Sequence, residues 1–152
     1  MIAFVSILYT LANILFLGNI LIMLAWRWFA EKTRDPKILT FANKTIRKTD
    51  RLLLGPSALA LTITGNIRSS LTHSSIWSNP RLAVAMVFFI LSGVVWLGRL
   101  VPIEKQQVRL CEEFSDDSSV PHAYFALSKK WFLWGGLAAI LALCSTIIRA
   151  AE

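Results

Sequence analysis

A basic stretch at residues 26–65, WRWFAEKTRDPKILTFANKTIRKTDRLLLGPSALALTITG, decides how this chain is arranged. It carries eight of the 16 Lys and Arg residues and lies between two apolar runs. Clustered Lys and Arg beside apolar runs are typical of the cytoplasmic connections of membrane proteins. The rest of the chain can therefore be placed relative to this stretch.

The composition excludes an ordinary soluble domain. The 152 residues are 55% hydrophobic and 16% charged, with a mean hydropathy of +0.58. The net charge is +7, but the basic residues lie beside apolar runs and do not interleave with aromatic residues on a polar surface. We therefore expect no nucleic-acid partner, and we expect anionic lipid headgroups at the cytoplasmic face as the opposing charge.

Four apolar runs predict a single membrane domain over residues 1–152, with transmembrane helices at about residues 2–28, 51–70, 80–101 and 129–149. The expected fold is an all-α antiparallel four-helix bundle. Residues 1–26 carry no charge and follow no basic leader, so we expect a retained anchor and not a cleaved signal peptide.

The second span is short, because only 16 residues separate Arg51 from Arg68. It can cross the bilayer if these arginines extend to the headgroups or if the helix continues into its neighbours. Gly55 and Pro56 are predicted to kink this helix, because proline removes a helical amide and clashes with the preceding turn.

The two cytoplasmic connections are predicted to contain helical extensions. Asp35 before Pro36 is a helix-start signal. The helix that follows has an apolar face, so we expect it to lie on the inner leaflet or to rise out of it. After Pro102, residues 103–114 have the pattern of a polar, partly amphipathic helix. In the first extension, which begins at Asp35 and Pro36, the apolar face consists of Ile38, Leu39, Ala42 and Ile46.

The positive-inside rule predicts the orientation. Both connections with helical extensions are basic, whereas the connection between spans two and three holds only Arg68 and Arg81. We therefore expect a multi-pass protein of the bacterial inner membrane with both termini on the periplasmic side. His73 is expected outside and His122 inside, so the two cannot ligate one haem together.

No catalytic constellation is present. The interiors of the spans contain no Asp, Glu, Lys or His, which argues against a proton relay or ion pathway. No phosphate loop, nucleophile elbow or metalloprotease motif occurs, and no metal site is predicted. Polar side chains do occur in span one at Tyr9, Asn13 and Asn19. They are either interhelical hydrogen-bonding groups or the lining of a pocket for a headgroup, haem or quinone.

The chain resembles the bacterial family of predicted integral membrane proteins known as domain of unknown function 2269. The resemblance implies a four-helix inner-membrane protein and covers nearly the whole chain. It rests on Gly18-Asn19, Thr33-Arg34-Asp35-Pro36, Thr49-Asp50-Arg51, Gly55-Pro56, Thr64-Gly65 and Val101-Pro102.

That family is more distantly similar to four-helix membrane protoporphyrinogen oxidases and copper-resistance membrane domains, which use a histidine in the first helix. Tyr9 occupies the corresponding position here. The resemblance marks a further group as a structural or binding cluster at the cytoplasmic end of the bundle, although Asp50 beside Arg51 can equally be a helix-end ion pair. This group comprises Arg34, Asp35, Asp50, Arg51, Gly55, Pro56 and Gly65.

From these observations we expect a small non-catalytic accessory or scaffold subunit of a larger inner-membrane complex. Its partners are expected to be other membrane subunits or further copies of the chain. The alternative is a membrane redox protein that binds haem or quinone.

Overall fold

The computed structural model describes residues 1–72, 79–114 and 119–150, and all regular structure in these ranges is helical. His73, in the predicted external loop, lies outside the described residues. The elements are α1 (Ile2–Thr33), α2 (Pro36–Thr49), the π-helical turn η1 (Asp50–Leu54), α3 (Gly55–Leu71), α4 (Pro80–Val95), the π-helical turn η2 (Trp96–Leu100), α5 (Val101–Glu113) and α6 (His122–Ala150).

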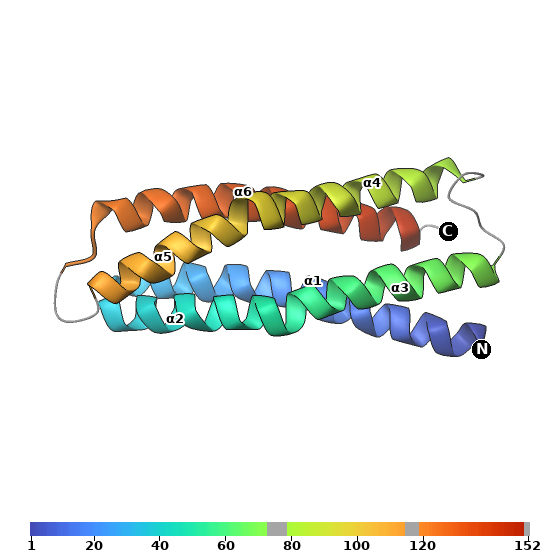
Figure 1. The fold of residues 1–152 in the computed structure, drawn as a ribbon, viewed down its shortest axis with the longest axis horizontal. Helices are drawn as coiled ribbons and strands as arrows, with labels where there is room; N and C mark the ends of the chain where they lie inside the picture. Colours follow the sequence, from blue (N-terminus) through green and yellow to red (C-terminus); the bar gives the residue numbers. More distant parts are fainter. Residues whose placement is uncertain (73–78, 115–118, 151–152) are drawn as a thin grey trace.

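These elements form four long antiparallel helical segments, because α2 runs through η1 into α3 and α4 runs through η2 into α5 (Figure 1). The start of α1 and the end of α6 lie at the same end of the bundle (Figure 1). The predicted all-α four-helix fold is therefore confirmed.

Within the described ranges, three segments are long and apolar enough to cross a membrane: Ile2–Thr33, Pro80–Glu113 and His122–Ala150. In the remaining segment, α3 has 17 residues and is about 26 Å long, slightly short of the roughly 30 Å hydrocarbon layer. Because η1 and α2 continue this helix without a break, the segment as a whole is long enough. The short second span thus extends into its neighbour, which was one of the two routes expected.

The tight connection between α1 and α2 explains the Thr33-Arg34-Asp35-Pro36 sequence. Arg34 ends α1 in the left-handed conformation, with a φ of 53°. The Asp35 side chain then caps α2 by accepting hydrogen bonds from the amides of Lys37 and Ile38, at 2.8 and 3.3 Å. Pro36 occupies the first turn, where no amide donor is needed. The predicted helix start at Asp35 is confirmed.

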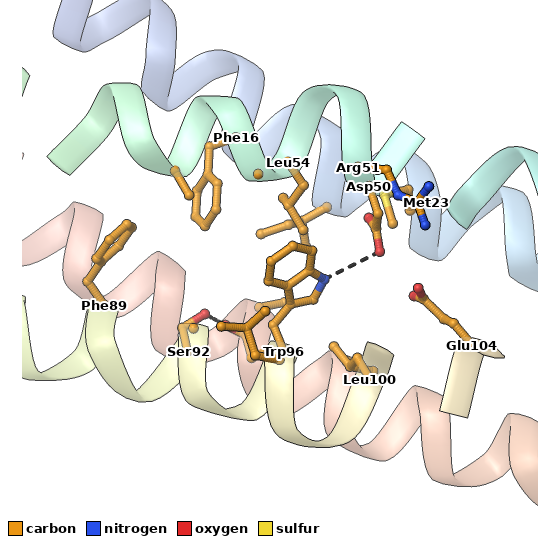
Figure 2. Close-up of a pocket in the computed structure, with 18 of the residues that line it drawn as sticks. Phe16, Met23, Asp50, Arg51, Leu54, Phe89, Ser92, Trp96, Leu100 and Glu104 are labelled. Carbon is orange, nitrogen blue, oxygen red and sulfur yellow. Dashed lines mark hydrogen bonds between the residues drawn. The ribbon is translucent and has the colours of Figure 1, made fainter. Parts of the chain in front are cut away.

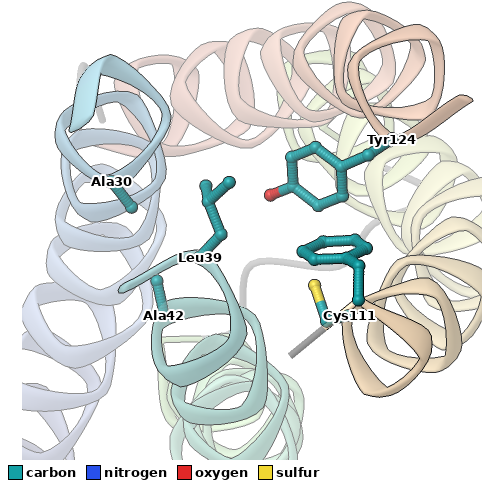
Figure 3. Close-up of a cluster of buried hydrophobic side chains, with 6 residues drawn as sticks. Ala30, Leu39, Ala42, Cys111 and Tyr124 are labelled. Atoms are coloured by element: carbon teal, nitrogen blue, oxygen red, sulfur yellow. The ribbon is translucent and has the colours of Figure 1, made fainter. Parts of the chain in front are cut away.

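The helix α2 packs against α1 and α5. Of its predicted apolar face, Leu39, Ala42 and Ile46 are buried, whereas Ile38 is 42% exposed. At the end of the bundle that holds α2 and α5, the four segments therefore pack around a core of their own. Figure 3 shows this core, which consists of Ala30, Leu39, Ala42, Cys111, Phe114 and Tyr124.

Two matching π-helical turns bend the second and third segments. In each turn the closing amide reaches back five residues: Gly55 N–H donates to Asp50 O, and Val101 N–H donates to Trp96 O. A proline follows each closing residue. Figure 1 shows both segments changing direction at these turns.

The bends close one end of the bundle and open the other. On one side of the turns α5 approaches α2, and the two helices pack together. On the other side α3 packs on α1 and α4 packs on α6, but no Cα atoms of α3 and α4 come within 8 Å of each other. The structure therefore contains a space between α3 and α4.

Candidate functional site

A cavity of about 550 Å³ occupies the space between α3 and α4, and α1 and α6 form its inner wall. Its volume is within the roughly 300–1,000 Å³ that is typical of ligand sites. Figure 2 shows Phe16 and Phe89 at one end of the site and Asp50, Arg51 and Glu104 at the other. The cavity therefore has an apolar body and one charged end.

Asp50 is the central residue of the charged end. Its side chain is only 4% exposed, and its Oδ2 accepts a hydrogen bond of 3.3 Å from Trp96 Nε1 (Figure 2). Its other oxygen, Oδ1, is buried and has no hydrogen-bond partner among the described residues. A buried polar atom without a partner is unfavourable, so this oxygen is a place where a ligand donor would be stabilised.

Glu104 lies on α5 beside Asp50, and its carboxyl extends toward the Asp50 side chain (Figure 2). It is also 4% exposed, and it accepts a hydrogen bond of 3.0 Å from Trp131 Nε1. Each of the two acids thus receives an indole N–H from a different helix. Two buried carboxylates at close range repel each other unless a proton or a cation lies between them.

Arg27 is the counter-charge of this region. It is 2% exposed, and its guanidinium lies 3.9 Å from the ring centroid of Trp131. It donates hydrogen bonds to Gln107 Oε1 and, at 2.7 Å, to Asn43 Oδ1. Asn43 in turn donates to the hydroxyl of Tyr124 at 2.7 Å. The charged end of the cavity therefore continues into a buried polar network that joins all four segments.

Arg51 differs from these residues because it lines the cavity while remaining exposed. It directly follows Asp50 in η1, so a positive and a negative side chain lie next to each other at the charged end. The arrangement suits a ligand with both charges. Among the described residues, no group of three or more His, Cys, Asp or Glu side chains could hold a metal ion.

The polar residues predicted in span one do not line this cavity. Asn13 donates to the Tyr9 carbonyl and is close to Thr146, whereas Asn19 is buried and donates to the Met23 sulfur. Tyr9 and Asn13 line an adjoining hollow of about 20 Å³, which shares Phe16, Thr62 and Phe89 with the cavity. That is room for about one water molecule and not for a haem or a quinone. Of these contacts only the hydrogen bond from Thr146 Oγ1 to Asn13 Oδ1 joins two helices, because the bonds from Asn13 to Tyr9 and from Asn19 to Met23 both lie within α1.

The group marked by the family resemblance is divided among three places. Arg34 and Asp35 form the exposed α1–α2 turn, at the far end of α2 from Asp50. Gly65 lies near the C-terminal end of α3, where an added Cβ would be 2.6 Å from Arg149 Nη1. The members that meet at the large cavity are Asp50, Arg51, Gly55 and Pro56.

Sequence analysis missed Arg27, Glu104, Trp96 and Trp131. Each lies at or near the end of an apolar run, where a charged or indole side chain is normally interpreted as a topology signal. The sequence did contain one signal that relates two of the site residues, which is the same spacing to a proline. Pro56 lies six residues after Asp50, and Pro102 lies six residues after Trp96.

Comparison with known proteins identifies a family. The model of a family described as predicted integral membrane protein (DUF2269) matches residues 3–148. No curated protein and no solved structure matches the chain.

Proposed function

We propose that this chain, which belongs to the family of predicted integral membrane proteins, is a non-catalytic membrane protein. We propose further that it holds a lipid-soluble molecule between α3 and α4. The observation that carries the proposal is the cavity of about 550 Å³. Its walls are mainly apolar, and its polar groups are confined to one end. This is the distribution that an amphiphilic ligand requires.

The separation of α3 and α4 supports entry from the bilayer. Because their backbones stay apart, a molecule dissolved in the hydrocarbon can enter sideways without passing through water. Leu59 of α3 and Leu97 of η2 line the cavity and are 65% and 63% exposed. The apolar surface of the site is therefore continuous with the surface that faces lipid.

We further propose that the chain acts as an accessory subunit of a larger inner-membrane complex, or as a homo-oligomer. The orientation proposed has both termini on the periplasmic side and α2 and α5 on the cytoplasmic side. Exposed Lys37, Lys44 and Lys48 on α2 support it, because they would lie where anionic headgroups are abundant.

Bound molecules in the purified protein test the ligand-holding role. The protein would be isolated from native membranes in a mild detergent, and its extract would be analysed by mass spectrometry and absorption spectroscopy. A stoichiometric amphiphile is expected. A bound quinone or haem would favour the redox alternative, and co-purifying subunits would support the accessory role.

A matched pair of glycine variants identifies the cavity as the binding place. Gly93 lines the cavity, Gly136 does not, and an added Cβ at either position would meet no atom within 4 Å. Gly93→Phe is expected to displace the ligand, whereas Gly136→Phe is expected to retain it. Equal retention in both variants, or no stoichiometric ligand in the unaltered protein, would overturn the proposal.

A further inference from the structure

The charged end of the cavity lies at the depth of lipid headgroups. The segment from Asp50 to the end of α3 has 22 residues, which corresponds to about 33 Å of helix. This is close to the roughly 30 Å thickness of the hydrocarbon layer. When the outer end of α3 reaches one face of the bilayer, Asp50 therefore reaches the other face.

Buried acids outnumber buried bases at this position. Among the described residues, the buried charged side chains are Arg27, Asp50 and Glu104. Arg27 is close enough to interact electrostatically with both acids. Arg27 balances only one of the two acids, so the pair needs either a shared proton or one further cation, and Asp50 Oδ1 has no donor among the described residues. The site thus has a place for one positive group that donates hydrogen bonds.

Arg51, the residue after Asp50, favours a negative group in the same ligand. Arg51 lines the same cavity beside Asp50, remains exposed, and has no ion pair among the described residues. A guanidinium at headgroup depth is a favourable partner for a phosphate. The two adjacent side chains therefore match a headgroup in which an ammonium and a phosphate are close together.

We propose that the molecule held between α3 and α4 is an aminophospholipid, with its ammonium group between Asp50 and Glu104, its phosphate on Arg51 and an acyl chain in the apolar cavity. This inference rests on the function proposed above and adds the chemical class of the ligand. An ammonium supplies three N–H donors, enough for the unpaired Asp50 oxygen and for Glu104. Trp96 and Trp131, which donate to the same acids, keep the two carboxyls oriented toward the ligand.

Competition between lipids tests the inference. The purified, delipidated protein would be reconstituted in vesicles of equal parts phosphatidylethanolamine, phosphatidylcholine and phosphatidylglycerol. It would then be re-extracted in mild detergent, and the retained lipid would be quantified by mass spectrometry. Phosphatidylethanolamine is expected to be enriched, since choline has no N–H donor and phosphatidylglycerol has no ammonium.

Three variants separate the two halves of the headgroup. Asp50→Asn and Glu104→Gln keep the side-chain shape and are each expected to lower the enrichment about tenfold, whereas Arg51→Gln removes a contact to the phosphate that all three lipids share and is expected to lower the total retained lipid about tenfold. Lys48→Gln removes an exposed charge from the same segment without touching the cavity and is expected to leave the enrichment unchanged. Circular dichroism and gel filtration would show that each variant is folded.

The outcomes distinguish this inference from the function on which it rests. Retention of the three lipids in the proportions of the vesicle, with loss in Gly93→Phe, would overturn the aminophospholipid and leave the binding role standing. A free long-chain amine that displaces the lipid, together with an unchanged Arg51→Gln variant, would overturn the phosphate contact. Absence of any retained lipid would overturn both proposals.

Discussion

Asp50 and Trp96 begin the two π-helical turns of the structure, and they are joined by a hydrogen bond of 3.3 Å from the indole Nε1 to the carboxyl Oδ2. The same two residues therefore start both bends and connect them across the cavity. On one side of this contact α2 and α5 pack together, and on the other side α3 and α4 stay apart. The contact therefore lies at the boundary between the packed part of the bundle and the cavity. We expect it to contribute to both stability and ligand binding.

Trp96→Phe should test this contact, since it removes the indole N–H and retains an aromatic ring. Asp50 would lose its donor, and an unpaired buried acceptor costs about 1–3 kcal/mol. We expect the free energy of unfolding to fall by that amount, measured by detergent-induced unfolding followed by circular dichroism. Trp26→Phe is the control, because Trp26 is 59% exposed. Equal losses in the two variants would contradict a specific role for the hydrogen bond.

Arg27→Met should be the most destabilising single change in the polar network. It leaves Asp50 and Glu104 without their buried counter-charge and takes a donor from both Gln107 and Asn43. Removing one member of a buried charged group typically costs about 3–5 kcal/mol. The same unfolding measurement on Arg109→Met is the control, because Arg109 is exposed on α5. A loss below about 1 kcal/mol for Arg27→Met would argue that water already solvates the guanidinium.

Asp35→Ala should affect stability without affecting the ligand. The substitution removes the cap that accepts the amides of Lys37 and Ile38, which is worth about 0.5–2 kcal/mol. The turn is at the far end of α2 from the cavity, so lipid retention should not change. Lys37→Ala in the same turn is the control for stability. Loss of the bound lipid in Asp35→Ala at unchanged stability would instead assign a binding role to this residue.

The orientation can be measured with single cysteines in a background in which Cys111 and Cys144 are replaced by serine. A membrane-impermeant maleimide should label Ser70→Cys, at the outer end of α3, in intact cells. It should label Arg109→Cys, at an exposed position of α5, only after permeabilisation. The reverse pattern would place α2 and α5 on the periplasmic side and overturn the proposed topology.

Much of the fold was predictable, because hydrocarbon excludes charge and requires backbone amides to be paired within the chain. Apolar runs therefore had to become helices, and their number was readable from the charges that separate them. The length of the second segment was not readable. Arg51 interrupts the apolar run, but the helix passes through it because η1 keeps the backbone paired.

The candidate site was only partly predictable. Asp50, Arg51, Gly55 and Pro56 are neighbours in sequence and remain neighbours at the cavity. Glu104 could not be grouped with them, because it is 54 residues away from Asp50 in a stretch that resembles an ordinary polar helix. Arg34 and Asp35 were grouped with the cluster, but they lie away from the cavity. Arg34 ends α1 in the left-handed conformation, and Asp35 caps α2.

The sequence by itself determined the membrane class, the four helical segments and the helix start at Asp35, because hydropathy and capping act on residues close together in the chain. Tertiary structure decided which side chains meet. The contact between Asp50 and Trp96, which are 46 residues apart, depends on the rotation of two helices and on the bend at each π-helical turn. Neither quantity follows from composition or periodicity, since both result from the packing of the whole bundle.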